Sequence, residues 1–176
     1  MPKALPMNLD SLSPPAYEYI HYTAEGNTAL DLNRSYVQTS KDFERHSPNG
    51  LWLSITGNND WEKTCLKTNY RLDNLKSKIQ VFLKLSSKIL IFHTTADYDN
   101  FAKKYGYYSE QERRVLLFRW EEIIKEYQGI AVPYLNPELF GIVQWRNAWC
   151  CTSACIWDLQ AVKEAYIIND RHLKGE

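Results

Sequence analysis

A turn that leads directly into an apolar strand, at residues 48–55, constrains the fold of this chain more than any other stretch. The turn reads Pro-Asn-Gly, and the strand reads Leu-Trp-Leu-Ser-Ile. Because neighbouring side chains of a strand point to opposite faces, the two leucines share one face and Trp52 and Ser54 share the other. With the leucines in a core, the opposite face offers an aromatic ring and a hydroxyl group to a ligand.

Further strand and helix signals alternate along the chain and predict an α+β fold with about seven short strands and about three helices. The segment at 88–93 is almost entirely apolar, so we expect it to be a central strand of the sheet. The segments that predict strands are residues 17–23, 51–55, 79–85, 88–93, 130–133, 154–158 and 165–169, and residues 34–38 are a further candidate for a short strand.

Three helices are expected from their capping residues. We expect the third to run as far as Tyr127, with a break near Arg119. The predicted helices begin near Trp61, after Thr94 or Thr95 with a stop at Gly106, and after a capping box at 109–112.

The length of 176 residues suits one domain with a sizeable core. We expect an extended lead-in at 1–15, a single globular domain at 16–170 and a tail at 171–176. Lys plus Arg and Asp plus Glu number 21 each, so no global field draws the protein to nucleic acid or to an anionic membrane. The 12 Tyr, six Trp and six Phe favour stacking on a planar ligand.

The sequence shows no targeting or membrane-spanning segment. Its start lacks the apolar run of a signal peptide, and no apolar stretch reaches about 18 residues. We therefore expect a cytoplasmic protein, in its own cell or in a host cell, with its four cysteines reduced.

The cysteines at Cys150, Cys151 and Cys155 predict buried free thiols. They lack the CxxC or HxxxH spacing of structural zinc sites, so we expect no metal. A Cys-His nucleophile with His21 or His93 is an alternative. Apolar neighbours disfavour it, because they raise the pKa of a thiol and make it inert.

His21 differs from the other histidines because it lies in an aromatic strand and is followed by Tyr22 and Thr23. A hydrogen-bonded core histidine and a ligand-binding histidine are both open interpretations of this position. The seven glycines form neither a GxGxxG nor a GxxxxGK[ST] pattern, which argues against conventional dinucleotide folds and P-loop enzymes.

The order His-x-Thr on one strand and Gly-Leu-Trp-Leu-Ser on a second resembles the ADP-ribosyltransferase superfamily. Its histidine-type members carry His-Gly-Thr or His-Gly-Ser, followed by Gly-[Ile/Leu]-Tyr-Phe-[Ala/Ser]. The matching residues here are 21–23 and 50–54. The resemblance covers the N-terminal third of the chain and implies a small split β-sandwich with helices at its sides.

The resemblance implies a site for NAD, which such enzymes use as a substrate. By this likeness His21 bonds the ribose, Tyr22 and Thr23 flank the nicotinamide amide, and Trp52 stacks on the nicotinamide ring with Ser54 on the same face. Nicotinamide leaves through an oxocarbenium-like state, which an acceptor nucleophile attacks. Stabilising that state is mostly electrostatic positioning.

The chain departs from the family pattern in three places. Tyr22 replaces a glycine, and Trp52 replaces the usual tyrosine. The third motif of the family, an acidic residue on a late strand, has no glutamate in its place. Ser153 lies nearest the expected position of this catalytic group. The alternative residues are Asp158, Gln144 and Glu138.

The predicted function is an ADP-ribosyltransferase-like protein that cleaves nicotinamide from NAD and transfers ADP-ribose to a protein, a nucleic acid or a small molecule. Such a protein fits an effector, a toxin or another modifier of host components. One alternative is a non-catalytic module that binds a nucleotide or a peptide in an aromatic-lined cleft. Another is an NAD glycohydrolase or RNA 2′-phosphotransferase on the same fold, whose phosphate-binding candidates are Arg34, Arg45 and Arg146.

Overall fold

The computed structural model describes residues 17–24, 29–38, 48–108, 116–135 and 149–168. Within these ranges the strands are β1 (Tyr19–Thr23), β2 (Leu51–Ile55), β3 (Ser77–Leu83), β4 (Ile89–Ile91), β5 (Gly106–Tyr108), β6 (Leu116–Phe118), β7 (Gly129–Val132), β8 (Ser153–Ile156) and β9 (Val162–Ile168). The α-helices are α1 (Trp61–Thr68), α2 (Thr95–Tyr105) and α3 (Trp120–Glu126), and the 3₁₀ helices are η2 (Leu72–Leu75) and η4 (Leu159–Ala161).

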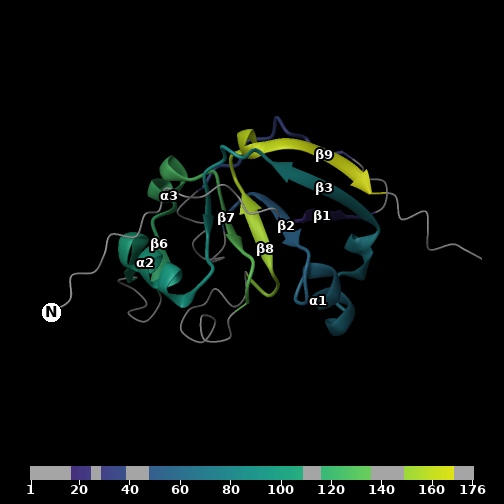
Figure 1. Cartoon of the computed structure of the whole chain (residues 1–176), viewed down its shortest axis with the longest axis horizontal. Coiled ribbons are helices and arrows are strands. Elements are labelled where there is room, and N and C mark those ends of the chain that lie inside the picture. The colour runs from purple at the N-terminus through teal and green to yellow at the C-terminus, as the bar shows by residue number, and fades with distance from the viewer. Residues whose placement is uncertain (1–16, 25–28, 39–47, 109–115, 136–148, 169–176) are drawn as a thin grey trace, which may run out of the picture.

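Seven of these strands form one sheet in the order β4-β7-β8-β2-β1-β3-β9, and β5 pairs separately with β6. The β4–β7 pair is parallel, and the other pairs in the described residues are antiparallel. Strands β3 and β9 arch across the top of the molecule, and β7 and β8 descend beneath them (Figure 1). The mixed α+β class predicted from the sequence is confirmed.

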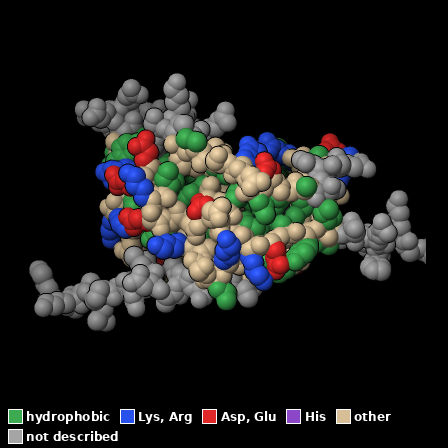
Figure 2. Space-filling model, turned by 90° about the horizontal axis from the view of Figure 1, so that it is seen from above, with side chains coloured by type: hydrophobic (Ala, Val, Ile, Leu, Met, Phe, Trp, Pro, Cys, Tyr) green, Lys and Arg blue, Asp and Glu red, His purple; other side chains and the backbone are tan. Residues whose placement is uncertain are grey.

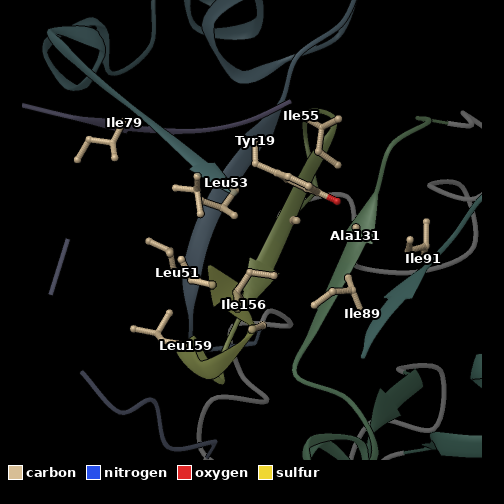
Figure 3. Packing of buried hydrophobic residues seen from close by; sticks show 14 residues of the cluster. Tyr19, Leu51, Leu53, Ile55, Ile79, Ile89, Ile91, Ala131, Ile156 and Leu159 are labelled. Carbon is tan, nitrogen blue, oxygen red and sulfur yellow. The ribbon is translucent and has the colours of Figure 1, made fainter. Parts of the chain in front are cut away.

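Apolar side chains cover both faces of this sheet. One cluster lies on the face shown in Figure 3, where Leu51 and Leu53 of β2 pack with residues of β1, β3, β4, β7 and β8. The second cluster lies on the opposite face and joins the sheet to α2 and α3 through aromatic side chains such as Phe101 and Trp120. Trp52 packs against this second cluster. The predicted separation of the two leucines from Trp52 is therefore confirmed.

Hydrogen bonds at the helix ends explain where the helices begin. The Asp60 carboxylate accepts from the backbone N–H of Lys63 at 2.9 Å and caps α1. Thr94 and Asp97 form a reciprocal capping box at the start of α2, and Gly106 follows its last residue. These starts agree with the sequence prediction, and Thr94 rather than Thr95 is the cap.

Three predictions about the elements are wrong. Residues 34–38 form no strand. The apolar segment that contains β4 lies at the edge of the sheet and not at its centre, because its uniform apolarity reflects two covered faces rather than two neighbouring strands. The third helix begins only at Trp120, since residues 116–118 pair with β5 instead. The predicted capping box at 109–112, the lead-in at 1–15 and the tail lie outside the described residues.

Charged and apolar side chains are unevenly distributed on the surface. Seen from above, hydrophobic side chains gather over the half of the molecule that holds β3 and β9, and charged side chains crowd the end with α2 and α3 (Figure 2). Phe82 of β3 and Tyr166 of β9 contribute to the exposed apolar surface, with their rings edge to face at 6.0 Å.

Candidate functional site

The candidate site lies where β1 and β2 separate. Strand β1 pairs with β3 over five residues, but it pairs with β2 only at Tyr19 and Ile20. At the next position, the side chain of His21 replaces the backbone pairing, because its Nδ1 lies 2.9 Å from the carbonyl oxygen of Trp52. This bond joins the two sequence segments that carry the His-x-Thr and Leu-Trp-Leu-Ser patterns.

The bond to Trp52 fixes the protonation of the His21 ring. A carbonyl oxygen only accepts hydrogen bonds, so Nδ1 carries the proton and donates it. Burial lowers the pKa of His21 below its ordinary value of 6.5, although the bond to Trp52 acts in the opposite direction. The ring is therefore mainly neutral at pH 7, and its Nε2 is an acceptor.

A cavity of about 500 Å³ lies at this separation of the strands. This volume is within the usual range for a small-molecule site. Five of the residues predicted for the site line the cavity, and they are His21, Tyr22, Trp52, Ser54 and Ser153. The structure thus brings together most of the predicted residues, although they come from three separate strands.

Thr23 is the predicted residue that the cavity does not include. It is buried, and its hydroxyl donates to the carbonyl oxygen of Ala24 at 3.2 Å. The structure therefore places Thr23 beside the site rather than in its wall.

The indole of Trp52 is supported from one side. It is half-buried, and its ring centroid lies 4.8 Å from that of the almost fully buried Trp149, with an angle of 57° between the rings. Contact with a buried neighbour restricts the rotamers of an aromatic side chain. Trp52 therefore presents a restrained apolar surface to the cavity.

Two buried serines of the cavity lining lie opposite each other on neighbouring strands. Ser54 of β2 faces Ser153 of β8 in the strand register. The Ser54 hydroxyl oxygen accepts from the backbone N–H of Trp61 at 3.0 Å, and the Ser153 hydroxyl donates to the carbonyl of Cys151 at 3.0 Å. Ser54 thus connects the site to the first residue of α1.

Tyr22 connects the cavity lining to a charged pair. Its hydroxyl donates to one carboxylate oxygen of Glu62 at 3.0 Å, and the Lys78 ammonium lies 3.0 Å from the other oxygen. Burial and the Glu62 charge both raise the pKa of Tyr22, so it stays a neutral phenol. The hydroxyl is engaged by Glu62, and the Lys78 ammonium also lies 5.9 Å from the centroid of the Tyr22 ring.

Cys150 corrects the prediction that the clustered cysteines are buried and inert. Cys151 and Cys155 are buried and their pKa values are raised, as predicted, but Cys150 is exposed and lines the cavity. The Cys151 thiol donates a hydrogen bond to the Cys150 sulfur and lowers the pKa of Cys150 to about 6. The sequence shows the adjacent cysteines but not the bend that exposes one of them.

Arg71 was also missed by the sequence prediction. It lines the cavity from the loop between α1 and η2, with a left-handed backbone φ of 52° and its guanidinium 5.3 Å from the ring centroid of Tyr70. Of the predicted arginines, Arg34 instead lies over the ring of Tyr36. Arg45 and Arg146 lie outside the described residues. An isolated arginine after a helix has no sequence pattern that distinguishes it.

Two of the four candidates for the acidic third motif, Ser153 and Asp158, belong to the described residues. Asp158 caps η4 and accepts from Gln128 at 2.7 Å, and it is not part of the cavity wall. Gln144 and Glu138 lie outside the described residues. Ser153 is thus the one of the four that the described structure places at the cavity.

His93 lies away from the cavity. It is exposed just after β4, where its backbone N–H donates to the carboxylate of Asp97. Among the described residues, no group of three or more His, Cys, Asp and Glu side chains is placed to hold a metal ion. None of the helices in the described ranges has the length and apolar character needed to span a bilayer.

Comparison of this chain with protein-family models, with curated proteins and with solved structures finds no match.

Proposed function

We propose that the cavity between β1 and β2 binds NAD and that the protein is an ADP-ribosyltransferase-like enzyme. The observation that carries this proposal is the hydrogen bond between the His21 ring and the Trp52 carbonyl, beside a cavity that residues of both segments line. The bond leaves Nε2 of a neutral histidine as an acceptor, which suits a ribose hydroxyl donor.

The other cavity residues suit the remaining parts of NAD. Trp52 offers a restrained indole surface on which the flat nicotinamide ring stacks. Arg71 supplies a cation toward which the diphosphate is drawn. Ser54 and Ser153 supply hydroxyl groups to the cavity lining. The acceptor of the ADP-ribose in this proposal is a protein, a nucleic acid or a small molecule.

A non-catalytic nucleotide-binding module is the second candidate function. It is favoured because no Asp or Glu belongs to the described residues that line the cavity. An RNA 2′-phosphotransferase has weaker support, since Arg71 is the single arginine among those lining residues. Nicotinamide release separates an NAD-cleaving enzyme from a binder.

The test measures nicotinamide release from NAD and the NAD-induced shift in melting temperature with the purified full chain. We expect His21→Ala and Trp52→Ala to abolish release and to weaken NAD binding by about tenfold each, the effect of one lost hydrogen bond or stacking contact. His93→Ala is the matched control, since its histidine lies outside the cavity.

Three outcomes distinguish the candidates. Release that requires His21 and Trp52, but not His93, supports the transferase. A melting shift with NAD in the absence of release supports the binding module. The absence of both nicotinamide release and a melting shift would contradict the proposal that this cavity binds NAD.

A further inference from the structure

The described lining of the cavity holds an exposed cysteine but no carboxylate. None of its described lining residues is Asp or Glu, yet an oxocarbenium-like state at the ribose requires a nearby negative charge or nucleophile. Cys150 lines the same cavity as His21 and Trp52 and is exposed to it. Its sulfur is therefore available to a molecule bound there.

The surroundings of Cys150 favour the thiolate. The buried Cys151 thiol donates to the Cys150 sulfur, and Cys151 lies in the cavity wall beside it. This arrangement lowers the pKa of Cys150 to about 6, so most of the group is ionised at pH 7. A thiolate is the reactive form of cysteine, and exposure gives it access to substrate.

The charged and titratable groups around Cys150 are compatible with this state. Arg71 contributes a positive charge from the loop after α1, and His21 of β1 and Tyr22 are neutral near pH 7. Cys65 of α1 lies within electrostatic range, but burial raises its pKa and keeps it a neutral thiol. Tyr70 completes the titratable groups of the described wall.

We propose that Cys150 is the nucleophile of this cavity and that it accepts ADP-ribose from NAD, an inference that rests on the proposed function. The Cys150 sulfur lone pair forms a bond to C1′ of the nicotinamide ribose. The C1′–N bond breaks, and its electron pair goes to the ring nitrogen. The thiolate and the cationic pyridinium become a neutral thioglycoside and neutral nicotinamide. No oxidant, reductant or further proton is needed.

The first test examines the thiol without NAD. The full chain is treated with iodoacetamide between pH 5 and pH 9. Alkylation is assigned to each cysteine by fragmentation in the mass spectrometer, because Cys150, Cys151 and Cys155 lie in one short stretch of sequence. We expect Cys150 to react well before Cys65 and Cys155, with half-maximal reactivity near pH 6. Cys151→Ala is expected to move that midpoint upward toward the ordinary thiol value of 9.0. Slow labelling of Cys150 with a midpoint near 9 would overturn its assignment as the nucleophile.

The second test adds NAD and measures both products. We expect Cys150, identified by fragmentation of its peptide, to gain the mass of one ADP-ribosyl group as one nicotinamide is released. Cys150→Ser should abolish the adduct, and Cys65→Ala, whose thiol lies outside the cavity wall, should retain it. Wild-type protein alkylated beforehand at Cys150 should also lose the adduct, which removes any dependence on how the variant folds.

The failure of this inference is distinguishable from the failure of the proposed function. Release that proceeds without an adduct, and that survives Cys150→Ser, overturns the role of Cys150 and leaves the NAD-cleaving function in place. Absence of both release and an NAD-induced melting shift overturns the two together, whatever the reactivity of Cys150 toward iodoacetamide.

Discussion

The two edges of β1 differ in how far they pair with the neighbouring strands. On one edge, β1 pairs with β3 from Tyr19 to Thr23, and on the other it pairs with β2 for two residues only. The side chain of His21 bridges to β2 beyond that point, and the cavity opens beside it. The fully paired edge holds the strand in place, and the interrupted edge leaves polar groups for a ligand. A single strand thus combines regular structure with a candidate site.

The largest expected effect is on the fully paired edge. Ile79 lies opposite His21 in the β3 register and is 2% exposed. We expect Ile79→Ala to lower the free energy of unfolding by about 2–5 kcal/mol, through lost burial and a residual cavity. Chemical denaturation measures this loss.

The neighbouring Gln80 provides the matched control, because it points to the other face of β3 and is only half-buried. We expect Gln80→Ala to stay within about 0.5 kcal/mol of the wild type. Equal losses for Ile79→Ala and Gln80→Ala would contradict the distinction between the inner and outer faces.

The second effect concerns the pairing of β2 with β8, two strands that both contribute residues to the cavity lining. A Cβ at Gly50 would lie 2.6 Å from the Cys155 sulfur and 2.8 Å from the carbonyl oxygen of Ile156. We therefore expect Gly50→Ala to cost about 1–3 kcal/mol of unfolding free energy through overpacking. Thermal and chemical denaturation measure it.

Gly57→Ala is the control for Gly50→Ala, since the nearest atom to its Cβ is 4.0 Å away. Gly57 lies after β2 rather than before it. If both substitutions destabilise the protein equally, the close contact between Gly50 and β8 is not the cause.

The third effect is a pH dependence at the interrupted edge. The pKa of His21 is lowered in the folded state, so the unfolded chain binds more protons once the pH falls through about 6.5. The stability from the neutral ring is thus present above this pH and is lost progressively below it. We expect wild-type stability to fall more steeply than that of His21→Gln between pH 7.5 and pH 5.5. Parallel curves for the two proteins would show that His21 titrates as it does in the unfolded chain.

The smallest effect is expected at Tyr22 in the cavity lining. Tyr22→Phe keeps the ring and removes the hydroxyl that donates to Glu62. We expect a loss of about 0.5–1 kcal/mol, the usual net worth of one partly buried hydrogen bond. Tyr166→Phe removes a similar bond to Glu164 on an exposed surface, and it should cause no measurable change. A loss for Tyr166→Phe as large as for Tyr22→Phe would contradict the role assigned to burial.

The features of the fold that depend on neighbouring residues in the sequence could be predicted from it. The cap at Thr94 and the alternation around Trp52 depend on near neighbours, and both predictions are confirmed. The edge position of β4 depends on which strands pair with it, and a buried segment has the same composition at an edge as at the centre. The strand at 116–118 depends likewise on its partner β5.

The prediction of site residues was limited in the same way, to residues whose position depends on local sequence. Trp52 and Ser54 could be predicted because a strand pattern directs them to one face, and His21 because of its setting in an aromatic strand. Arg71 and Cys150 could not, because their place at the cavity depends on a loop conformation and on a bend. Neither feature leaves a periodic signal in the sequence.

The pairing of β2 with β8 has a consequence for synthesis on the ribosome. Thr152, just before β8, donates to the carbonyl oxygen of Ile55, which precedes it by 97 residues. Contacts of such long sequence separation form late, since a long loop must first close. A nascent chain thus carries both the His21 and Trp52 segments well before the wall at 150–153 exists. A translation product truncated before that wall contains the recognisable motifs but has no complete pocket.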